Sequence, residues 1–94
     1  MSPFLPDIPP EVAEIIRHLP PEIKRSVKKA LRVLSEEPEA GEPLRRELAG
    51  LWKYRVRRCR IVYAIDRPRR SLRVVAVGQR HRIYKDLSEQ IRRK

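Results

Sequence analysis

The residues whose types and spacing suggest chemistry are arginines in one short stretch. Arg55 and Arg57 are two positions apart, and Arg60 follows three positions later. Residues two apart in a strand point to one face, and forked guanidinium groups on one face are suited to hold a phosphate. They can also stabilise the charge that develops on phosphoryl oxygens during transfer. Because arginine keeps its proton above about pH 12, we expect these residues to bind rather than to transfer protons.

Proton transfer would require side chains of another type. His81 directly follows Arg80, and Tyr84 comes three residues after His81. Histidine titrates near neutral pH, and cationic surroundings can lower the pKa of a tyrosine, so both are candidates for an acid or a base. A plain surface position explains His81 equally well, and Tyr84 can instead pack its ring on neighbouring residues. His18, at the end of a predicted helix, is better explained by a favourable interaction with the helix dipole.

The positive charge is concentrated in one part of the chain. The 94 residues carry a formal net charge of +11. Residues 45–85 contain 14 Lys or Arg against two acids, while the rest of the chain is nearly balanced. Such a segment fits a polyanion, because lysine and arginine release counterions when they bind phosphates. RNA is the favoured partner, a membrane surface is the rival polyanion, and a merely solvated basic face is the simplest alternative.

Length and composition exclude several other classes of protein. A chain of 94 residues can feed one core, so we assign residues 1–94 to a single domain. No apolar run reaches spanning length and the first residues lack the pattern of a signal peptide, so we expect a cytoplasmic protein that does not bind membranes. Cys59 is the only cysteine, which excludes an internal disulfide and argues against a metal site. We expect neither a metal nor a cofactor.

Two helices are predicted in the first half of the chain. Pro10 suits a first helical position, and apolar residues recur at helical spacing until Pro20 ends the helix. Pro21 opens a second helix that carries an apolar stripe. The two helices are expected to form a hairpin over one face of a sheet. Residues 36–43 form the loop that follows, and we assign no catalytic role to its acids, because a solvated loop explains them.

The second half of the chain is predicted to form an antiparallel sheet. From Trp52 the apolar period changes from 3.6 to 2, and residues 52–57, 60–66 and 72–78 have the composition of strands. The prolines among the first ten residues allow a fourth strand only if it is short and lies at the sheet edge. Residues 86–94 are expected to form a short C-terminal helix. The fold class is therefore α+β, with a helical hairpin packed on a three- to four-stranded antiparallel sheet.

The pairing of the first two strands decides where the arginines lie. If residues 58–59 form the turn, Arg57 lies opposite Arg60 and Arg55 lies opposite Val62. The three arginines then share one face, where their repulsion costs stability unless an anion binds between them. Two-residue turns favour Gly or Asn, and neither is present, so a longer connection with another register stays open.

The order and spacing of these elements resemble those of the RelE/ParE toxin superfamily. The resemblance rests on Leu48-x-Gly50-Leu51-Trp52-Lys53-Tyr54-Arg55-Val56-Arg57, then Arg60-Ile61-Val62-Tyr63, then Val77-Gly78-Gln79-Arg80-His81-Arg82-x-Tyr84. The elements Leu19-Pro20-Pro21-Glu22 and Leu34-x-x-x-Pro38 precede these motifs and fit the helical hairpin of the family. The resemblance is greatest to the RelE branch and spans about residues 10–87. It implies the toxin of a type II toxin-antitoxin pair, neutralised by its antitoxin.

For the RelE branch, the resemblance implies an mRNA interferase that inhibits translation. Such a metal-independent endoribonuclease enters the ribosomal A site and cleaves mRNA there, by attack of a ribose 2′-OH on the adjacent phosphate. The catalytic role would fall on Arg57, Arg60, Arg80, His81 and Tyr84, and RNA binding on Lys53, Arg55, Arg58, Arg82 and Lys85. Relatives often have lysine where Arg55 and Arg57 stand, so the identity of the general base is open. The expected partners are the ribosome and an acidic or amphipathic antitoxin, the latter in a hetero-oligomer.

Two other functions are compatible with the same scaffold. A ParE-like toxin would inhibit gyrase without catalysis, although gyrase binding gives no reason to retain Arg60, Arg80 and Tyr84 together. A catalytically silent RNA-binding relative would bind with steep salt dependence and leave no cleavage products.

Overall fold

A computed structural model describes residues 3–78. Within this range the strands and α-helices follow one another as β1 (Leu5–Asp7), α1 (Pro10–Arg17), α2 (Pro21–Glu36), β2 (Glu42–Pro43), β3 (Leu51–Val56), β4 (Cys59–Asp66) and β5 (Ser71–Gly78). Two short 3-10 helices, η1 (Pro38–Ala40) and η2 (Arg46–Leu48), flank β2. The predicted C-terminal helix, residues 86–94, and the candidate site residues Arg80, His81, Arg82, Tyr84 and Lys85 lie outside the described residues.

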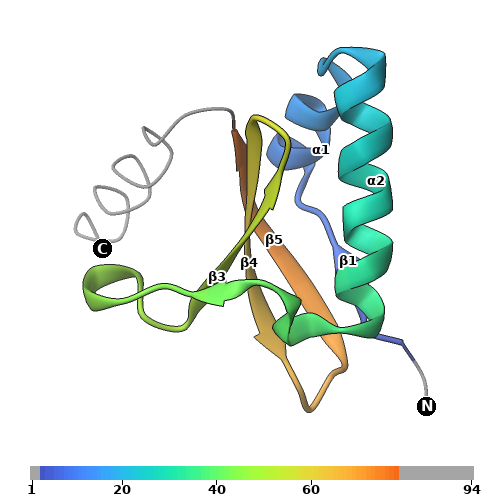
Figure 1. The fold of residues 1–94 in the computed structure, drawn as a ribbon. Coiled ribbons are helices and arrows are strands. Elements are labelled where there is room, and N and C mark those ends of the chain that lie inside the picture. The colour runs from blue at the N-terminus through green and yellow to red at the C-terminus, as the bar shows by residue number, and fades with distance from the viewer. Residues whose placement is uncertain (1–2, 79–94) are drawn as a thin grey trace.

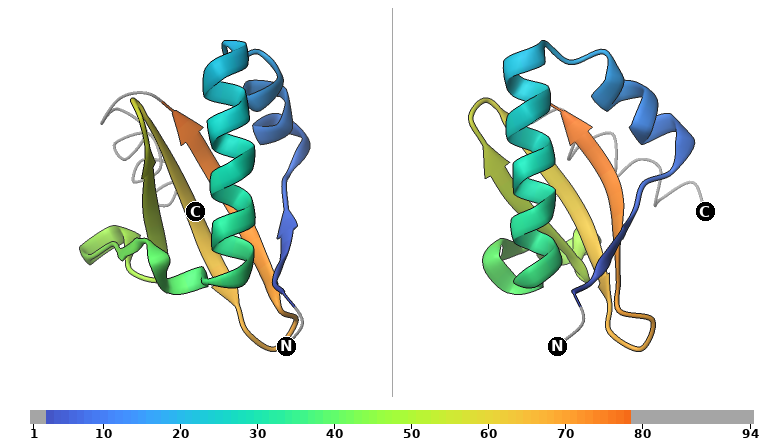
Figure 2. Two further views of the ribbon diagram at one scale, coloured as in Figure 1. Left: turned by 45° about the vertical axis from the view of Figure 1, so that its right-hand side comes forward. Right: turned by 90° about the vertical axis from the view of Figure 1, so that its right-hand side faces the viewer.

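Two helices cover one face of a five-stranded sheet. The strand order is β1-β5-β4-β3-β2 (Figure 1), and the turned views show α1 and α2 on the same side of the sheet (Figure 2). This confirms the α+β class and the helical hairpin packed on a sheet. The sheet differs from the prediction in two respects: it has five strands rather than three to four, and β1 pairs with β5 in parallel. The added strands have three and two residues, which is too short for a periodic pattern to reveal.

Prolines set the first residue of each α-helix. Pro10 and Pro21 begin α1 and α2, as predicted. The N–H groups in the first turn of a helix have no acceptor within the helix, so a proline at this position loses no hydrogen bond. The carbonyl oxygen of the preceding Pro20 accepts a hydrogen bond of 2.8 Å from the Lys24 N–H. The paired prolines therefore start both helices without a side-chain cap.

The main core lies between the helices and the sheet. Side chains from α2, β4 and β5 are fully buried there: Val27, Leu34, Ile61, Tyr63, Leu72 and Val74. Trp52 and Tyr54 are partly buried and pack against this core, and the rings of Trp52 and Tyr63 stack with centroids 6.4 Å apart. The aromatic residues of the sheet thus contribute to the core, as their alternation with aliphatic residues indicated. Among residues 3–78, no helix is long and apolar enough to cross a membrane.

The edge strand β1 is short and protected against further pairing. The Leu5 N–H donates to the Arg70 carbonyl at 2.9 Å, so it faces β5. Because successive N–H groups of a strand point to opposite sides, the outward position belongs to Pro6, which has no N–H to donate. The Phe4 N–H holds this segment to α2 through the Ser35 carbonyl at 2.8 Å. The prediction of a short strand at the sheet edge is confirmed.

Candidate functional site

The β3–β4 hairpin determines which basic side chains meet. Arg57 and Arg58 form its turn, and Arg55 lies directly opposite Arg60. The predicted turn at residues 58–59 was therefore wrong by one residue. The reason is conformational: Arg57 has a φ of 54°, in the left-handed region that a two-residue turn needs and that Gly or Asn usually supplies. The turn preferences of the residue types alone therefore predict no turn at residues 57–58.

Four side chains line a cleft beside this hairpin. Directly opposed residues share a face of the sheet, so Arg55 and Arg60 point the same way. Lys53 is two positions before Arg55 on β3 and shares this face, and Glu42 pairs with Lys53 from β2. Together they enclose a cleft of about 370 Å³. Because neighbouring Ile61 points into the core between helices and sheet, the cleft lies on the face that the helices leave open.

The cleft is electropositive. Its described lining holds three cations and one carboxylate, and among these four side chains Lys53 Nζ lies 3.9 Å from Glu42 Oε2. Arg55 makes no hydrogen bond or ion pair within residues 3–78 and is exposed. Like charges directly opposed across two strands destabilise a sheet by up to about 1 kcal/mol. A bound phosphate would remove that repulsion, which makes the pair Arg55 and Arg60 suited to an anionic ligand.

Sequence reasoning overlooked Glu42. It treated the acids of residues 36–43 as a solvated loop, whereas β2 places Glu42 directly opposite Lys53. The available signal was weak: a residue before proline favours extended backbone, and Glu42 precedes Pro43. It is the one carboxylate among the described residues of the cleft, and carboxylates can act as general bases.

Arg57 does not join Arg55 and Arg60 in this cleft, contrary to the predicted register. It lines a second cleft, of about 380 Å³, together with four residues of α2: Glu22, Arg25, Ser26 and Lys29. Arg58, the other turn residue, is exposed and belongs to neither cleft. The predicted cluster of arginines is therefore divided between two surfaces.

The arginines of the β4–β5 turn have partners within the chain. Arg67 pairs with Glu39 at 2.9 Å and Arg69 pairs with Asp66 at 3.9 Å. The Arg70 guanidinium lies 4.8 Å from the centre of the Phe4 ring. These contacts give the cations of the β4–β5 turn a structural role. This turn lies at the opposite end of β4 from the turn of the β3–β4 hairpin.

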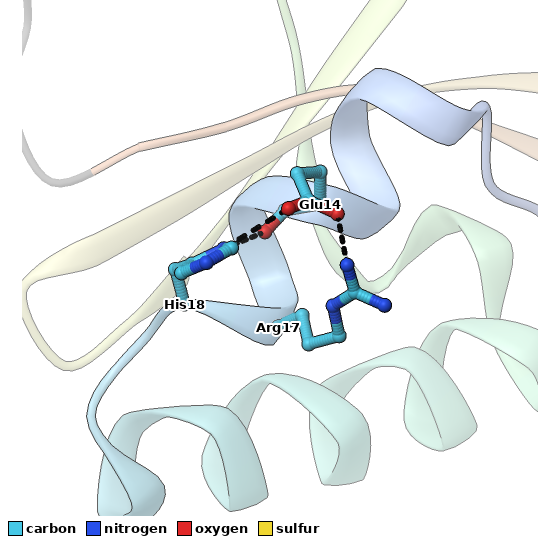
Figure 3. A network of polar contacts seen from close by, with 3 residues as sticks. All are labelled: Glu14, Arg17 and His18. Atoms are coloured by element: carbon cyan, nitrogen blue, oxygen red, sulfur yellow. Dashed lines mark hydrogen bonds and ion pairs between the residues drawn. The ribbon is translucent and has the colours of Figure 1, made fainter.

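Two titratable side chains of the described region have structural roles. His18 ends α1, where its Nδ1 lies 2.9 Å from the Glu14 carbonyl oxygen, and Arg17 pairs with the Glu14 carboxylate at 2.5 Å (Figure 3). Tyr63 donates its hydroxyl to the Pro38 carbonyl at 2.6 Å, and burial raises the pKa of Tyr63 to about 12. Neither contributes to the clefts.

No metal centre is formed by the part of the chain that the structure describes. Within residues 3–78, no cluster of His, Cys, Asp and Glu could hold an ion. Cys59 forms no disulfide within residues 3–78 and is fully buried in β4.

The described residues thus form a small α+β domain with a cationic cleft on the open face of its sheet. Residues 10–84 match the family described as the ParE toxin of the type II toxin-antitoxin system parDE. The chain therefore belongs to this toxin family, within the RelE/ParE superfamily that the sequence motifs resemble. No curated protein sequence matches the chain.

Solved structures of toxins share the fold. A chain of the toxin-antitoxin complex RelBE2 from Mycobacterium tuberculosis is 34% identical, with a TM-score of 0.76, over 83% of this chain and 99% of that one. A variant of Escherichia coli RelE in the free state is 24% identical over 97% and 99%, with a TM-score of 0.77. The archaeal RelE–RelB complex from Pyrococcus horikoshii gives 20% identity over 87% and 99%, with a TM-score of 0.70. The last two show similarity of fold alone.

Proposed function

We propose that this toxin is a ribosome-dependent mRNA endonuclease that cleaves in the A site without a metal. The observation that carries the proposal is the direct opposition of Arg55 and Arg60 across the β3–β4 hairpin, with Lys53 on the same face. Repulsion between these cations gives no benefit to folding, whereas a phosphodiester needs such an arrangement. The cleft is also open, with Arg55 exposed, so a strand of RNA can reach it.

The proposed reaction is transfer of a phosphoryl group within one RNA chain. The ribose 2′-oxygen forms a bond to phosphorus, the bond from phosphorus to the 5′-oxygen breaks, and a 2′,3′-cyclic phosphate and a 5′-OH result. The guanidinium groups of Arg55 and Arg60 would stabilise the charge on the non-bridging oxygens. A base takes the proton of the 2′-OH, and an acid gives a proton to the leaving oxygen.

Glu42 is the proposed base. Its carboxylate lines the same cleft as Arg55 and Arg60, and it can accept a proton that arginine cannot. The Lys53 Nζ lies 3.9 Å from the Glu42 carboxylate and attracts it by charge. His81 and Tyr84 remain the proposed sources of the proton for the leaving group, and Arg80 remains a proposed catalytic residue. Arg57, predicted to be catalytic, lines the second cleft, and we propose it as an RNA contact instead.

The proposed partners are an antitoxin and the ribosome. The similarity to chains of toxin-antitoxin complexes supports an acidic or amphipathic antitoxin, bound in a hetero-oligomer. The ribosome is proposed because the cleft offers cations for the backbone and few groups that would unfold and position a free RNA. With these partners, the proposed location of the protein is the cytoplasm.

Primer extension on translated mRNA tests this proposal. Wild-type protein should produce cuts at A-site codons, and Arg55→Ala should reduce cleavage by about 10²-fold, the effect of losing one group that stabilises transition-state charge. Arg32→Ala is the matched control, because Arg32 is an exposed arginine of α2 that lines neither cleft. Absence of A-site cuts with the wild-type protein, or equal activity of Arg55→Ala and Arg32→Ala, would overturn the proposal.

Inhibition of gyrase is the second candidate function, because the matching family carries the ParE name. A supercoiling assay with purified gyrase separates the two. The proposed endonuclease should leave supercoiling unchanged at concentrations that cleave mRNA. A catalytically silent relative would instead bind ribosomes without cuts and without an effect on gyrase.

A further inference from the structure

The second cleft is formed between α2 and the turn of the β3–β4 hairpin. Its lining consists of Glu22, Arg25, Ser26, Lys29 and Arg57. Its three cations make no ion pair or hydrogen bond within residues 3–78, and all three are exposed. The cleft is thus positively charged, and its cations are free to take an external partner.

The backbone at Arg57 is held in a costly conformation that directs the residue to this cleft. A φ of 54° costs a non-glycine residue stability, and Gly would fit the turn without that cost. An arginine at this position is explained if its side chain has a function on the α2 side of the hairpin. Arg55 and Arg60, in contrast, line the cleft on the face that the helices leave open.

The lining of the second cleft identifies the chemistry of its ligand. None of the five described residues that line it is apolar, so these residues offer no surface for the apolar face of an amphipathic protein segment. The cleft between α1 and α2 is different, since Ile8, Ala13 and Ile16 line it beside Arg17, Lys24 and Lys28. Cations without apolar neighbours suit phosphates, whose binding is driven by charge and counterion release.

We propose that Arg25, Lys29 and Arg57 form a second phosphate-binding site, which holds the backbone of an RNA segment other than the one in the first cleft. The two clefts lie on opposite sides of the hairpin turn. If one RNA strand fills the first cleft alone, filling both clefts requires a folded RNA with phosphates on each side of the turn. The hairpin therefore enters a crevice in a structured RNA. This inference rests on the proposed function, because the ribosome supplies such a crevice.

Salt-dependent binding to ribosomes without mRNA tests the inference. The variant R25A/K29A should bind about tenfold more weakly at about 100 mM salt, and the slope of log K against log salt should fall by about 1.4–1.8, the value for two lost phosphate contacts. The variant K24A/K28A is the matched control. It removes the same charge from the same helix, but Lys24 and Lys28 line the cleft between α1 and α2. The slope of log K against log salt should change by less than half as much for this variant.

A short single-stranded RNA distinguishes the two clefts. Arg55→Ala should weaken its binding, whereas R25A/K29A should leave it unchanged. Inorganic phosphate as a competitor should displace the short RNA and the ribosome, but only ribosome binding should be sensitive to R25A/K29A. All variants replace exposed or partly exposed side chains, and circular dichroism checks that they fold. Arg57→Gly, which suits the positive φ, supplies a second variant of the same site.

Several results would overturn the inference. Equal losses in R25A/K29A and K24A/K28A would mean that these cations act only through the overall field of the protein. Equal losses for ribosomes and short RNA would mean that one strand occupies both clefts. Normal ribosome binding by R25A/K29A with loss of binding to poly-glutamate would assign the site to an acidic protein segment. Lack of ribosome binding by the wild type would also exclude the inference.

The same samples keep this inference separate from the proposed function. If the wild type cleaves in the A site and the two double variants bind ribosomes equally, the second site is excluded and the proposed endonuclease stands. If the two double variants differ in ribosome binding and no cleavage occurs, the endonuclease is excluded and the second site stands.

Discussion

At the scale of single residues, three arginines adopt a backbone conformation that arginine rarely takes. Arg46, Arg57 and Arg70 have φ values of 58°, 54° and 50°. Left-handed backbone costs an L-residue about 1–2 kcal/mol, so each position must be held by its surroundings. Arg70 is held by its contact with Phe4 and by the hydrogen bond that its carbonyl accepts from Leu5. For Arg57, the hairpin itself imposes the conformation.

Replacing Arg57 should therefore change the stability of the protein and its binding to ribosomes in opposite directions. Arg57→Gly is expected to raise the free energy of unfolding by about 0.5–1 kcal/mol, because glycine adopts the required φ without strain. The same variant should bind ribosomes more weakly. Arg58→Gly is the control, since Arg58 has no positive φ and glycine there should lower stability. Urea unfolding measures both, and a lower stability for Arg57→Gly than for Arg58→Gly would contradict the strain argument.

Glu42 allows a second prediction at this scale, which separates chemistry from affinity. Glu42→Gln preserves the shape of the side chain and removes its ability to take a proton. If Glu42 is the base, A-site cleavage should fall by about 10²–10⁴-fold, while binding to programmed ribosomes should stay equal or become tighter, because one negative charge leaves a cationic cleft. Quantitative primer extension and a binding titration on the same ribosomes measure both. Unchanged cleavage would return the role of base to His81 or Tyr84.

The sequence located the charge but not its division between two faces. The alternation of Lys53 and Arg55 was enough to predict their common face. The side on which Arg57 lies depended on a one-residue shift of the turn, which neighbouring residue types do not encode because arginine has no preference for positive φ. Glu42 escaped notice for a different reason: its position is set by pairing with β3, a contact between residues distant in sequence.

At the scale of elements, the corner between η1 and β2 fixes the wall of the first cleft. The Tyr63 hydroxyl lies at this corner, donating to the Pro38 carbonyl and accepting from the Gly41 N–H at 3.3 Å. A Cβ at Gly41 would overlap the carbonyl oxygen of Lys53 and lie 2.6 Å from the Tyr63 hydroxyl. The close approach of β2 to β3 therefore requires glycine at position 41.

Gly41→Ala is predicted to destabilise the protein and to disturb the cleft. The overlap involves backbone, which cannot rotate away, so a loss of about 1–3 kcal/mol is expected, together with reduced cleavage through displacement of Glu42. Gly50→Ala is the control. Its φ of 96° makes alanine strained, but nothing lies within 4 Å of the added Cβ. It should lower stability without a comparable loss of activity. Thermal unfolding measures the stability of both variants and primer extension measures their activity. Equal losses of activity in Gly41→Ala and Gly50→Ala would mean that backbone strain, and not displacement of Glu42, causes the loss.

Tyr63 predicts how the same corner responds to pH. Burial raises the pKa of Tyr63 to about 12 in the folded protein, above the value of about 10 in an unfolded chain. The neutral hydroxyl is thus favoured by folding, and its contribution is complete below about pH 10 and lost as the pH rises from about 10 to 12. The difference in free energy of unfolding between wild type and Tyr63→Phe should shrink over that interval. A constant difference in urea unfolding would contradict the assignment.

The elements also show which sequence signals are sufficient for prediction. Proline pairs fixed the starts of α1 and α2 to the residue, because proline is tolerated in a first turn and disrupts a helix interior. The strands β4 and β5 were recognisable from their length and β-branched composition. The short strand β2 was not recognisable, and β1 was predicted only as an optional edge strand, since their pairing depends on β3 and β5 rather than on any pattern of their own.

At the scale of the whole molecule, the excess of positive charge should oppose folding. The chain has a formal net charge of +11, and like charges repel more strongly in a compact state than in an expanded chain. Within residues 3–78, ion pairs such as Arg67 with Glu39 and Arg17 with Glu14 join exposed side chains. Exposed pairs contribute at most about 1 kcal/mol each, so we expect the repulsion among the remaining cations to exceed their contribution.

Stability should therefore increase with ionic strength. Raising sodium chloride from about 0.01 M to about 0.3 M shortens the screening length from roughly 30 Å to below 10 Å, which weakens repulsion across the molecule more than it weakens pairs in contact. Phosphate at equal ionic strength should stabilise further, because an ion bound only by the folded state adds its binding free energy to that of folding. Urea unfolding across a salt series measures both effects. If chloride lowered stability, the exposed ion pairs would outweigh the repulsion; if phosphate and chloride acted equally, the opposed Arg55 and Arg60 would not form an anion site, and the physical basis for placing a phosphodiester there would be lost.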